Sequence, residues 1–253
     1  MGATSHVMAV RGEGRMKVTI NRERNLAPVT RQALAELLDG ADLDITVETY
    51  LELPISQGFG MSAAGALSAA LALAEILGRN REEAIKATHR AEVIHRCGLG
   101  DVAGISIGGV NIRTVEGVAP YGRAERIAKD LELVVAVMGS SLPTASVLFN
   151  RGLRRVIDLT GAECIDSLVK SPSLANFLRL SREFSEITGL MTDEVELGLR
   201  TVDDLGLSSM IMLGNSIFVT GDLEEAERRL SPLGEVHRVR ADWHGPRILD
   251  SDR

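Results

Sequence analysis

The segment Pro54–Gly65, with the sequence PISQGFGMSAAG, decides how this chain of 253 residues is interpreted. It follows Asp44–Leu53, where apolar and polar residues alternate as in a strand, and it leads into small residues that predict a helix as far as Leu77. Glycines at such a junction let the backbone approach an anion, and the start of a helix adds unpaired N–H groups and a positive dipole end. The segment predicts a phosphate-binding loop, and the alternative is a tight turn that binds no ligand.

Known phosphate-binding motifs narrow this prediction. A P-loop ends in Gly-Lys-Ser or Gly-Lys-Thr, and no lysine stands near Gly60. The dinucleotide fingerprint G-x-G-x-x-A is matched by Gly58, Gly60 and Ala63, so an NAD-dependent oxidoreductase is one alternative. Against it, four residues separate the expected strand from the first glycine, and the motif lies outside the first strand–helix unit.

Two acidic residues downstream suit phosphoryl transfer. Transfer from ATP requires a divalent cation, and Mg²⁺ takes one or two protein oxygens besides phosphate and water. Ser62 and Glu92 can supply such oxygens, and Asp101 can orient the acceptor hydroxyl or take its proton. Each acid taken alone is more typical of a solvated surface, so their combination with the loop is what favours this chemistry.

Arg113 is a candidate for binding the substrate. It follows Gly108 and Gly109 on an expected strand, and a guanidinium pairs with a carboxylate through two hydrogen bonds. An ordinary surface arginine is the alternative for this position.

Composition restricts the partners. The formal charge is −7, from 28 Lys+Arg against 35 Asp+Glu, which argues against general nucleic-acid binding. No run of eighteen apolar residues predicts a membrane span. The two cysteines, Cys97 and Cys164, lack CxxC spacing, so we expect a reduced, cytoplasmic chain.

The hydrophobic pattern mixes strands and helices without strict β-α-β alternation, which favours an α+β fold. A β-hairpin is expected from His6–Arg11 and Met16–Asn21, and a loop at Gly98–Gly109, where five of twelve residues are glycine. The other expected helices are Thr30–Leu38, Arg81–His95, Ala145–Arg155, Leu174–Thr188, Thr192–Asp204 and Leu223–Leu230. The other expected strands are Val110–Val115, Leu133–Met138, Ser209–Leu213, Ile217–Thr220 and Val236–Arg240.

The phosphate-loop segment resembles the motif P-x-x-x-G-L-G-S-S-A-A of the GHMP kinase superfamily. The positions that coincide are Pro54, Gly58, Gly60, Ser62, Ala63 and Ala64, while Phe59 replaces Leu and Met61 replaces the first Ser. The stretches GFGMSAAGALS, AEV, GLGDV and GGVNIR are most similar to archaeal pantoate kinases, strongly over Leu53–Arg113 and more loosely after Met138.

This resemblance implies a two-lobed fold and an activity. The expected lobes are an S5 domain 2-like ATP-binding lobe at 1–125 and a ferredoxin-like lobe at 126–253. The implied reaction is ATP-dependent phosphorylation of (R)-pantoate on the route to coenzyme A, with mevalonate or homoserine as alternative acceptors. A homodimer is a further expectation.

The resemblance also implies roles for single residues. Backbone amides from Gly58 to Ala64 would bind the phosphates, Ser62 and Glu92 the Mg²⁺, and Asp101 would act at the hydroxyl. Thr144 corresponds to a threonine near the active site of related kinases, or it is a plain helix N-cap.

Two features depart from the family pattern. The third family motif, G-x-G-G-G, corresponds here to Gly206–Asn215, where only the ends carry glycine and the methionines are typical of core. Family members also begin with a segment carrying a Pro-Gly-His type motif, whereas this sequence starts at what resembles the following strand. We therefore expect either a shortened enzyme or a nucleotide-binding relic without turnover.

Overall fold

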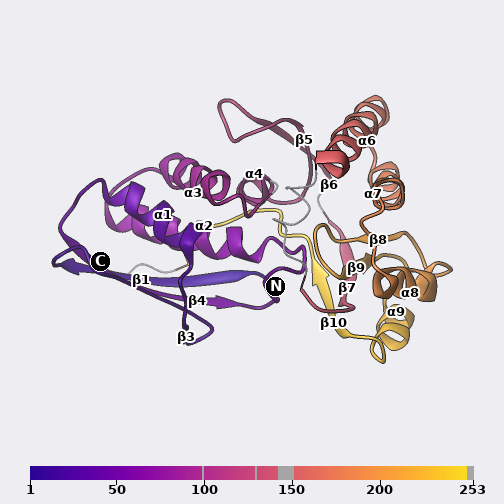
Figure 1. The fold of residues 1–253 in the computed structure, drawn as a ribbon, viewed down its shortest axis with the longest axis horizontal. Coiled ribbons are helices and arrows are strands. Elements are labelled where there is room, and N and C mark those ends of the chain that lie inside the picture. The colour runs from indigo at the N-terminus through magenta and orange to yellow at the C-terminus, as the bar shows by residue number, and fades with distance from the viewer. Residues whose placement is uncertain (99, 129, 142–150, 250–253) are drawn as a thin grey trace.

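The computed structural model describes residues 1–98, 100–128, 130–141 and 151–249, which form two lobes, each built on a sheet (Figure 1). The first part of the chain contains β1 (Ala3–Arg11), β2 (Met16–Ile20), β3 (Glu23–Arg24), α1 (Pro28–Leu38), β4 (Leu43–Leu51), α2 (Met61–Ile76), α3 (Arg81–His95), α4 (Asp101–Ile107), β5 (Val110–Val115) and β6 (Arg123–Ala128). The second part contains β7 (Glu132–Val137), α6 (Arg151–Lys170), α7 (Leu174–Thr188), α8 (Asp193–Val202), β8 (Ser208–Met210), β9 (Ser216–Val219), α9 (Leu223–Leu230) and β10 (Glu235–Arg240). The predicted α+β class is confirmed.

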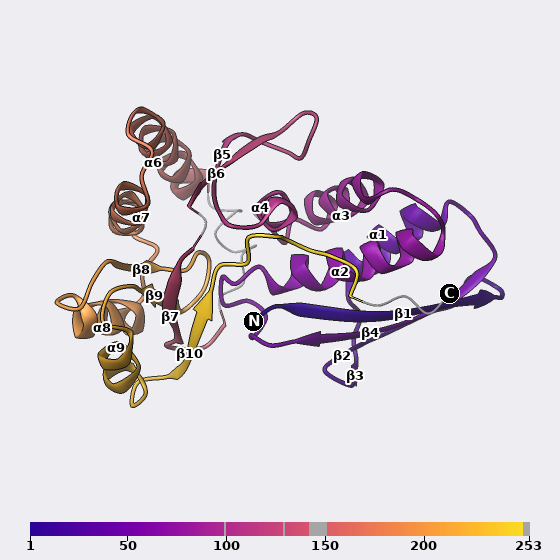
Figure 2. The same ribbon diagram turned by 180° about the vertical axis from the view of Figure 1, so that it is seen from behind.

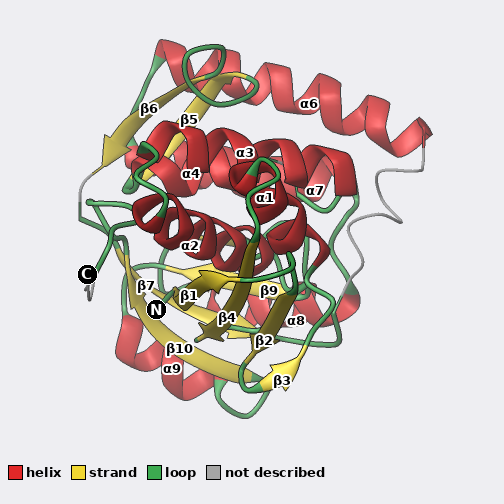
Figure 3. Ribbon diagram, turned by 90° about the vertical axis from the view of Figure 1, so that its left-hand side faces the viewer, coloured by secondary structure: helices red, strands yellow, loops and turns green. Residues whose placement is uncertain are grey.

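The first sheet has the strand order β1-β4-β2-β3, with β4 antiparallel to β1 and parallel to β2. Figure 3 shows α1, α2 and α3 together on one side of it. The strands bury apolar side chains toward these helices, among them Val18, Ile45 and Val47. The alternate positions face outward, as expected for a sheet with one covered face, and they include polar residues and the exposed apolar side chains of Met8 and Val10.

Helix α2 packs directly on the sheet because its side chains are small. Ala66, Ala69 and Ala70 have no exposed surface. A Cβ atom on Gly65 would lie 3.2 Å from the Thr49 methyl carbon, so the helix and β4 are already in close contact. This packing fixes the N-terminal end of α2, which the Pro54–Gly65 segment enters.

The second sheet, β10-β7-β9-β8, is antiparallel throughout. Helices α8 and α9 pack on it around a core that includes Val134, Leu199 and Ile217. Helix α7 contacts β8, and α6 packs against α7. The β5–β6 hairpin joins the lobes and has its own small core with the α6–α7 pair.

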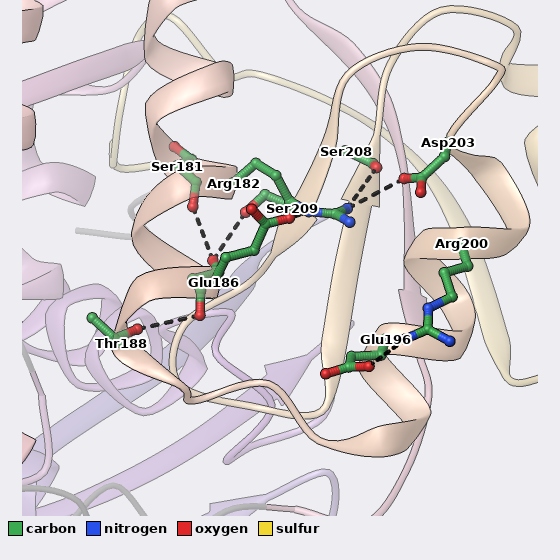
Figure 4. A network of polar contacts seen from close by, with 10 residues as sticks. Ser181, Arg182, Glu186, Thr188, Glu196, Arg200, Asp203, Ser208 and Ser209 are labelled. Atoms are coloured by element: carbon green, nitrogen blue, oxygen red, sulfur yellow. Dashed lines mark hydrogen bonds and ion pairs between the residues drawn. The ribbon is translucent and has the colours of Figure 1, made fainter.

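A polar network links three elements of the second lobe (Figure 4). Arg182 of α7 donates to Glu186 at 2.6 Å and reaches Asp203, after α8, at 3.4 Å and Ser208 of β8 at 3.5 Å. Half-exposed pairs of this kind contribute little stability individually. Their effect here is to orient α7 against β8.

The expected hairpin of His6–Arg11 and Met16–Asn21 is wrong, because β4 lies between β1 and β2. The Asp44 carboxylate at the start of β4 accepts hydrogen bonds from the backbone N–H groups of Glu13 and Arg15, at 2.9 and 2.8 Å. The glycine turn therefore wraps around the end of a third strand instead of closing a two-stranded ribbon.

The expected loop at Gly98–Gly109 is also wrong, since most of it is helix α4. Gly100 and Gly108 lie at its two ends with φ of 92° and 68°, so these glycines cap a short helix. The expected helix Ala145–Arg155 falls largely outside the described residues, and α6 begins at Arg151 and continues to Lys170.

After β10 the chain returns to the first lobe and runs past α4 toward α2 (Figure 2). The Gly109 N–H donates to the Asp242 carbonyl at 2.7 Å, and the Arg126 guanidinium carbon lies 4.4 Å from the centre of the Trp243 ring. The predicted division at 125/126 falls inside β6 and stays a prediction. Within the described ranges, no helix has the length and apolar content that crossing a membrane requires.

Candidate active site

The segment between β4 and α2 forms a glycine-rich loop at the end of the first lobe. Gly58 and Gly60 have φ of 85° and 65°, values that favour glycine, and Gly60 precedes the first helical residue, Met61. The first backbone N–H groups of α2 have no intrahelical acceptor, and they lie at the positive end of the helix dipole. The loop and helix start therefore have the backbone features on which the predicted phosphate site depends, and the binding of phosphate itself stays a prediction.

A groove of about 1870 Å³ passes this loop. Seven of the predicted site residues line it, namely Gly58, Phe59, Gly60, Met61, Ala64, Asp101 and Arg113. Ser62, Ala63 and Glu92 do not line it. Thr144 lies outside the described residues.

Asp101 contacts the glycine-rich loop between β4 and α2, which is called the phosphate loop below because the sequence predicts that it binds phosphate. A Cβ atom on Gly60 would lie 3.3 Å from Asp101 Cβ and 3.4 Å from its Oδ2, so the loop and this carboxylate are close neighbours and a side chain at position 60 would crowd them. Burial raises the pKa of Asp101, while the charge of Arg113 acts to lower it. Arg113 also donates from Nη1 to the Gly100 carbonyl at 3.0 Å, which holds the guanidinium beside the start of α4.

Glu92 lies behind Asp101, with its side chain almost completely buried. Its Oε1 accepts the Asp101 backbone N–H at 3.1 Å, so the carboxylate caps helix α4. Burial, and next the Asp101 charge, raise the pKa of Glu92 to about 7. The sequence placed these two acids in one site, and the structure brings them together across the α3–α4 junction.

The acidic pair suits a divalent cation. Glu92 Oε2 and His89 Nδ1 are buried and have no hydrogen-bond partner within the described part of the chain, and these two atoms are 3.6 Å apart. A buried carboxylate oxygen without a partner is costly, and a cation beside it would remove that cost. The described residues contain no group of three or more His, Cys, Asp or Glu side chains in metal-binding arrangement.

The loop is held from the other lobe by residues that sequence reasoning missed. A Cβ atom on Gly58 would overlap the Ile211 carbonyl oxygen, and one on Gly214 would overlap the Gln57 backbone. The Gly206–Asn215 segment, whose role the sequence left open, thus packs on the phosphate loop at its C-terminal end. Met210 is core, as its residue type suggested. No local sequence pattern marks Gln57, because the groups that its side chain contacts lie far along the chain.

The sheet topology does not match the dinucleotide-binding alternative. The fingerprint requires a mostly parallel sheet with a tight turn after the strand. Here β4 pairs antiparallel with β1, and residues 52–57 separate it from Gly58.

Comparison with known proteins identifies relatives of this chain. Residues 25–109 match the model of the GHMP kinases N terminal domain. The chain is 34% identical over 197 residues to a pantoate kinase of Thermococcus kodakarensis, covering 77% of this chain and 65% of that protein. It is 34% identical over 223 residues to a pantoate kinase of Methanospirillum hungatei, covering 87% and 74%.

A solved structure extends the similarity to the whole fold. It is described as a phosphotransferase related to the CoA biosynthesis pathway, and it superposes with a TM-score of 0.83 at 29% identity, covering 97% of this chain and 85% of that one. Both lobes, the glycine loop and the carboxylate pair therefore occur within the matched region, and the chain belongs to the GHMP kinase superfamily, with pantoate kinases among its relatives.

Proposed function

We propose that this chain transfers the γ-phosphoryl group of ATP to the terminal hydroxyl of (R)-pantoate, in the presence of Mg²⁺. The observation that carries the proposal is the contact of Gly60 with Asp101, which places an acidic side chain beside an anion-binding loop in one groove with Arg113. The two curated relatives named pantoate kinase support the choice of acceptor.

Each part of the site has a role in this reaction. The N–H groups from Gly58 to the first turn of α2 bind phosphate oxygens, and Arg113 pairs with the pantoate carboxylate. Asp101 accepts the hydroxyl proton as the new oxygen–phosphorus bond forms and the bond to the departing ADP breaks. Burial supports that role, because a raised pKa makes the carboxylate a stronger base.

Ser62 and Glu92 are the residues we assign to Mg²⁺. The ion would neutralise phosphate charge during transfer. Glu92 Oε2 is buried and has no hydrogen-bond partner among the described residues, with His89 Nδ1 at 3.6 Å, which supports this assignment. Ser62 lies in the first turn of α2, next to the loop.

The direct test is Mg²⁺- and ATP-dependent ADP release with pantoate, mevalonate and homoserine assayed side by side. We expect release with pantoate alone. Release with another acceptor would keep the kinase and replace its substrate, and silence with all three, together with nucleotide binding, would favour a binding relic.

We further propose a cytoplasmic homodimer. The sequence composition supports the compartment, because neither cysteine is placed for a disulfide with the other. The free edge of β1 supports self-association, since in the described part of the chain β1 pairs with β4 alone. Light scattering of the purified protein measures the mass, and a monomer at micromolar concentration would contradict the dimer.

A further inference from the structure

Gln57 connects the phosphate loop to the second lobe. Its side chain is buried, with 4% of its surface exposed, although it lies in a loop between exposed Ser56 and half-buried Gly58. A glutamine that is buried in a loop must satisfy both ends of its amide.

Both ends of the amide find partners, and all of them belong to the second lobe. Nε2 donates to the Gly139 carbonyl, just after β7, at 2.8 Å. Oε1 accepts the Asn215 backbone N–H at 3.0 Å and the Ser216 hydroxyl at 3.4 Å, both where β9 begins. The side chain therefore spans from one strand end of the second sheet to the neighbouring one.

These partners are themselves fixed. The Asn215 side chain donates from Nδ2 to the Ser140 carbonyl and accepts from Thr192 Oγ1, each at 2.8 Å. Ser216 is completely buried. The groups that the Gln57 amide contacts are therefore held in place at the ends of β7 and β9. Through these contacts, the amide can fix the position of the loop relative to the second sheet.

The position of the loop determines where its backbone N–H groups point, and these are the groups that would bind the nucleotide. Gln57 is bonded to Gly58, and the direction of the Gly58 N–H depends on the peptide unit that the two residues share. Gly58 has a φ of 85° and packs on the Ile211 carbonyl, so the peptide between Gln57 and Gly58 cannot rotate freely. Without the amide, the loop would retain its glycines and lose the polar contacts that select one conformation.

We propose that Gln57 is a positioning residue, which couples the phosphate loop to the β7–β9 strand ends and holds the loop N–H groups in the orientation that binds ATP. The inference rests on the proposed function, because it takes the loop as the nucleotide site. It assigns the effect to ATP binding and not to the acceptor.

The test is a comparison of Gln57→Met, which keeps the side-chain volume and removes the polar contacts, with wild type. Binding of a non-hydrolysable ATP analogue is followed by calorimetry, and KM values are determined separately for ATP and pantoate. Three hydrogen bonds are lost in this variant. We expect the dissociation constant and the KM for ATP to rise about tenfold, a factor that corresponds to the net free energy of about one hydrogen bond, with the KM for pantoate nearly unchanged.

The matched control is Ser185→Ala. It removes the buried hydrogen bond of 3.1 Å between the Ser185 and Ser209 hydroxyls, which lies within the second lobe. A structural effect of losing buried polar contacts would lower the melting temperature in both variants, whereas only Gln57→Met should weaken ATP binding. Equal ATP affinity in folded Gln57→Met protein would overturn the inference.

The milder variant Ser216→Ala covers the case in which Gln57→Met does not fold. It removes one contact with Gln57 Oε1, and we expect a small loss of ATP affinity in this single variant. Where Gln57→Met does fold, adding Ser216→Ala to it should cause no further loss. No effect of Ser216→Ala on ATP affinity, combined with misfolding of Gln57→Met, would also count against the proposal. Wild-type protein that binds no ATP would refute the proposed function itself, so the two failures are distinguishable.

Discussion

At the scale of single residues, Asp101 carries the proposed chemistry. Its carboxylate meets the phosphate loop at Gly60 and stands beside Arg113. Asp101→Ala should lower kcat by about 100-fold or more, the usual contribution of a positioned proton acceptor. Nucleotide affinity should stay within about twofold, because the loop N–H groups are untouched. Steady-state kinetics with analogue binding measure both quantities, and full turnover by the variant would remove Asp101 from the mechanism.

The same scale shows what the sequence could reveal of the site. Gly58, Gly60 and Asp101 were predictable because their residue types at that spacing suit phosphoryl transfer, and the structure brings them to one groove. Gln57 was not predictable, because its partners are backbone groups near residues 139 and 215, more than eighty positions away. Hydrogen bonds to a distant backbone leave no pattern in the local sequence.

At the scale of elements, the α3–α4 junction gives a pH-dependent prediction. Glu92 of α3 has its pKa raised from 4.5 to about 7, mainly by burial. The folded protein therefore holds this proton more tightly than the unfolded chain does, and the associated stability is present below pH 4.5 and is lost as the pH rises to about 7.

Glu92→Gln should remove this pH dependence, because an amide cannot ionise and its oxygen can still accept the Asp101 N–H. Urea unfolding of metal-free and nucleotide-free protein across this range measures the difference. Glu48→Gln, an exposed change on β4, is the matched control. The same pH dependence of stability in wild type and Glu92→Gln would contradict the assigned environment of Glu92, whereas the contribution of His89, whose pKa burial lowers, is present in both proteins.

Element boundaries followed the sequence wherever local signals determine them. The bounds of α3, α7 and α9 agree with the expected ones, since α3 begins with the reciprocal Asn80–Glu83 capping contacts and all three carry apolar periodicity. Strand β6 was missed because its residues, RAERIA, do not alternate clearly. The position of β4 between β1 and β2 was missed because pairing between distant strands is decided by tertiary packing.

At the scale of the whole molecule, the C-terminal tail, which is the segment that follows β10, contacts the first lobe and so connects the two lobes. It forms one wall of the groove, and it docks where Arg126 covers Trp243 and where Gly109 donates to Asp242. Gly109 must be glycine here, because a Cβ atom would lie 3.0 Å from the Trp243 ring and the residue has a φ of 69°. The tail therefore belongs to the architecture of the site.

The contact between Arg126 and Trp243 can be measured by a double-mutant cycle. The cation lies over the ring face, so Arg126→Ala and Trp243→Ala should be non-additive, with a coupling of about 0.5–1 kcal/mol in the free energy of unfolding. Arg123→Ala, on the same strand and exposed, paired with Trp243→Ala should be additive.

If the tail fixes the groove wall, Trp243→Ala should also raise the KM for pantoate, because Asp242 and Arg113 line the same groove. Additive energies in the Arg126 cycle with an unchanged KM would mean that the tail lies on the surface without shaping the groove, which the first lobe would then shape by itself.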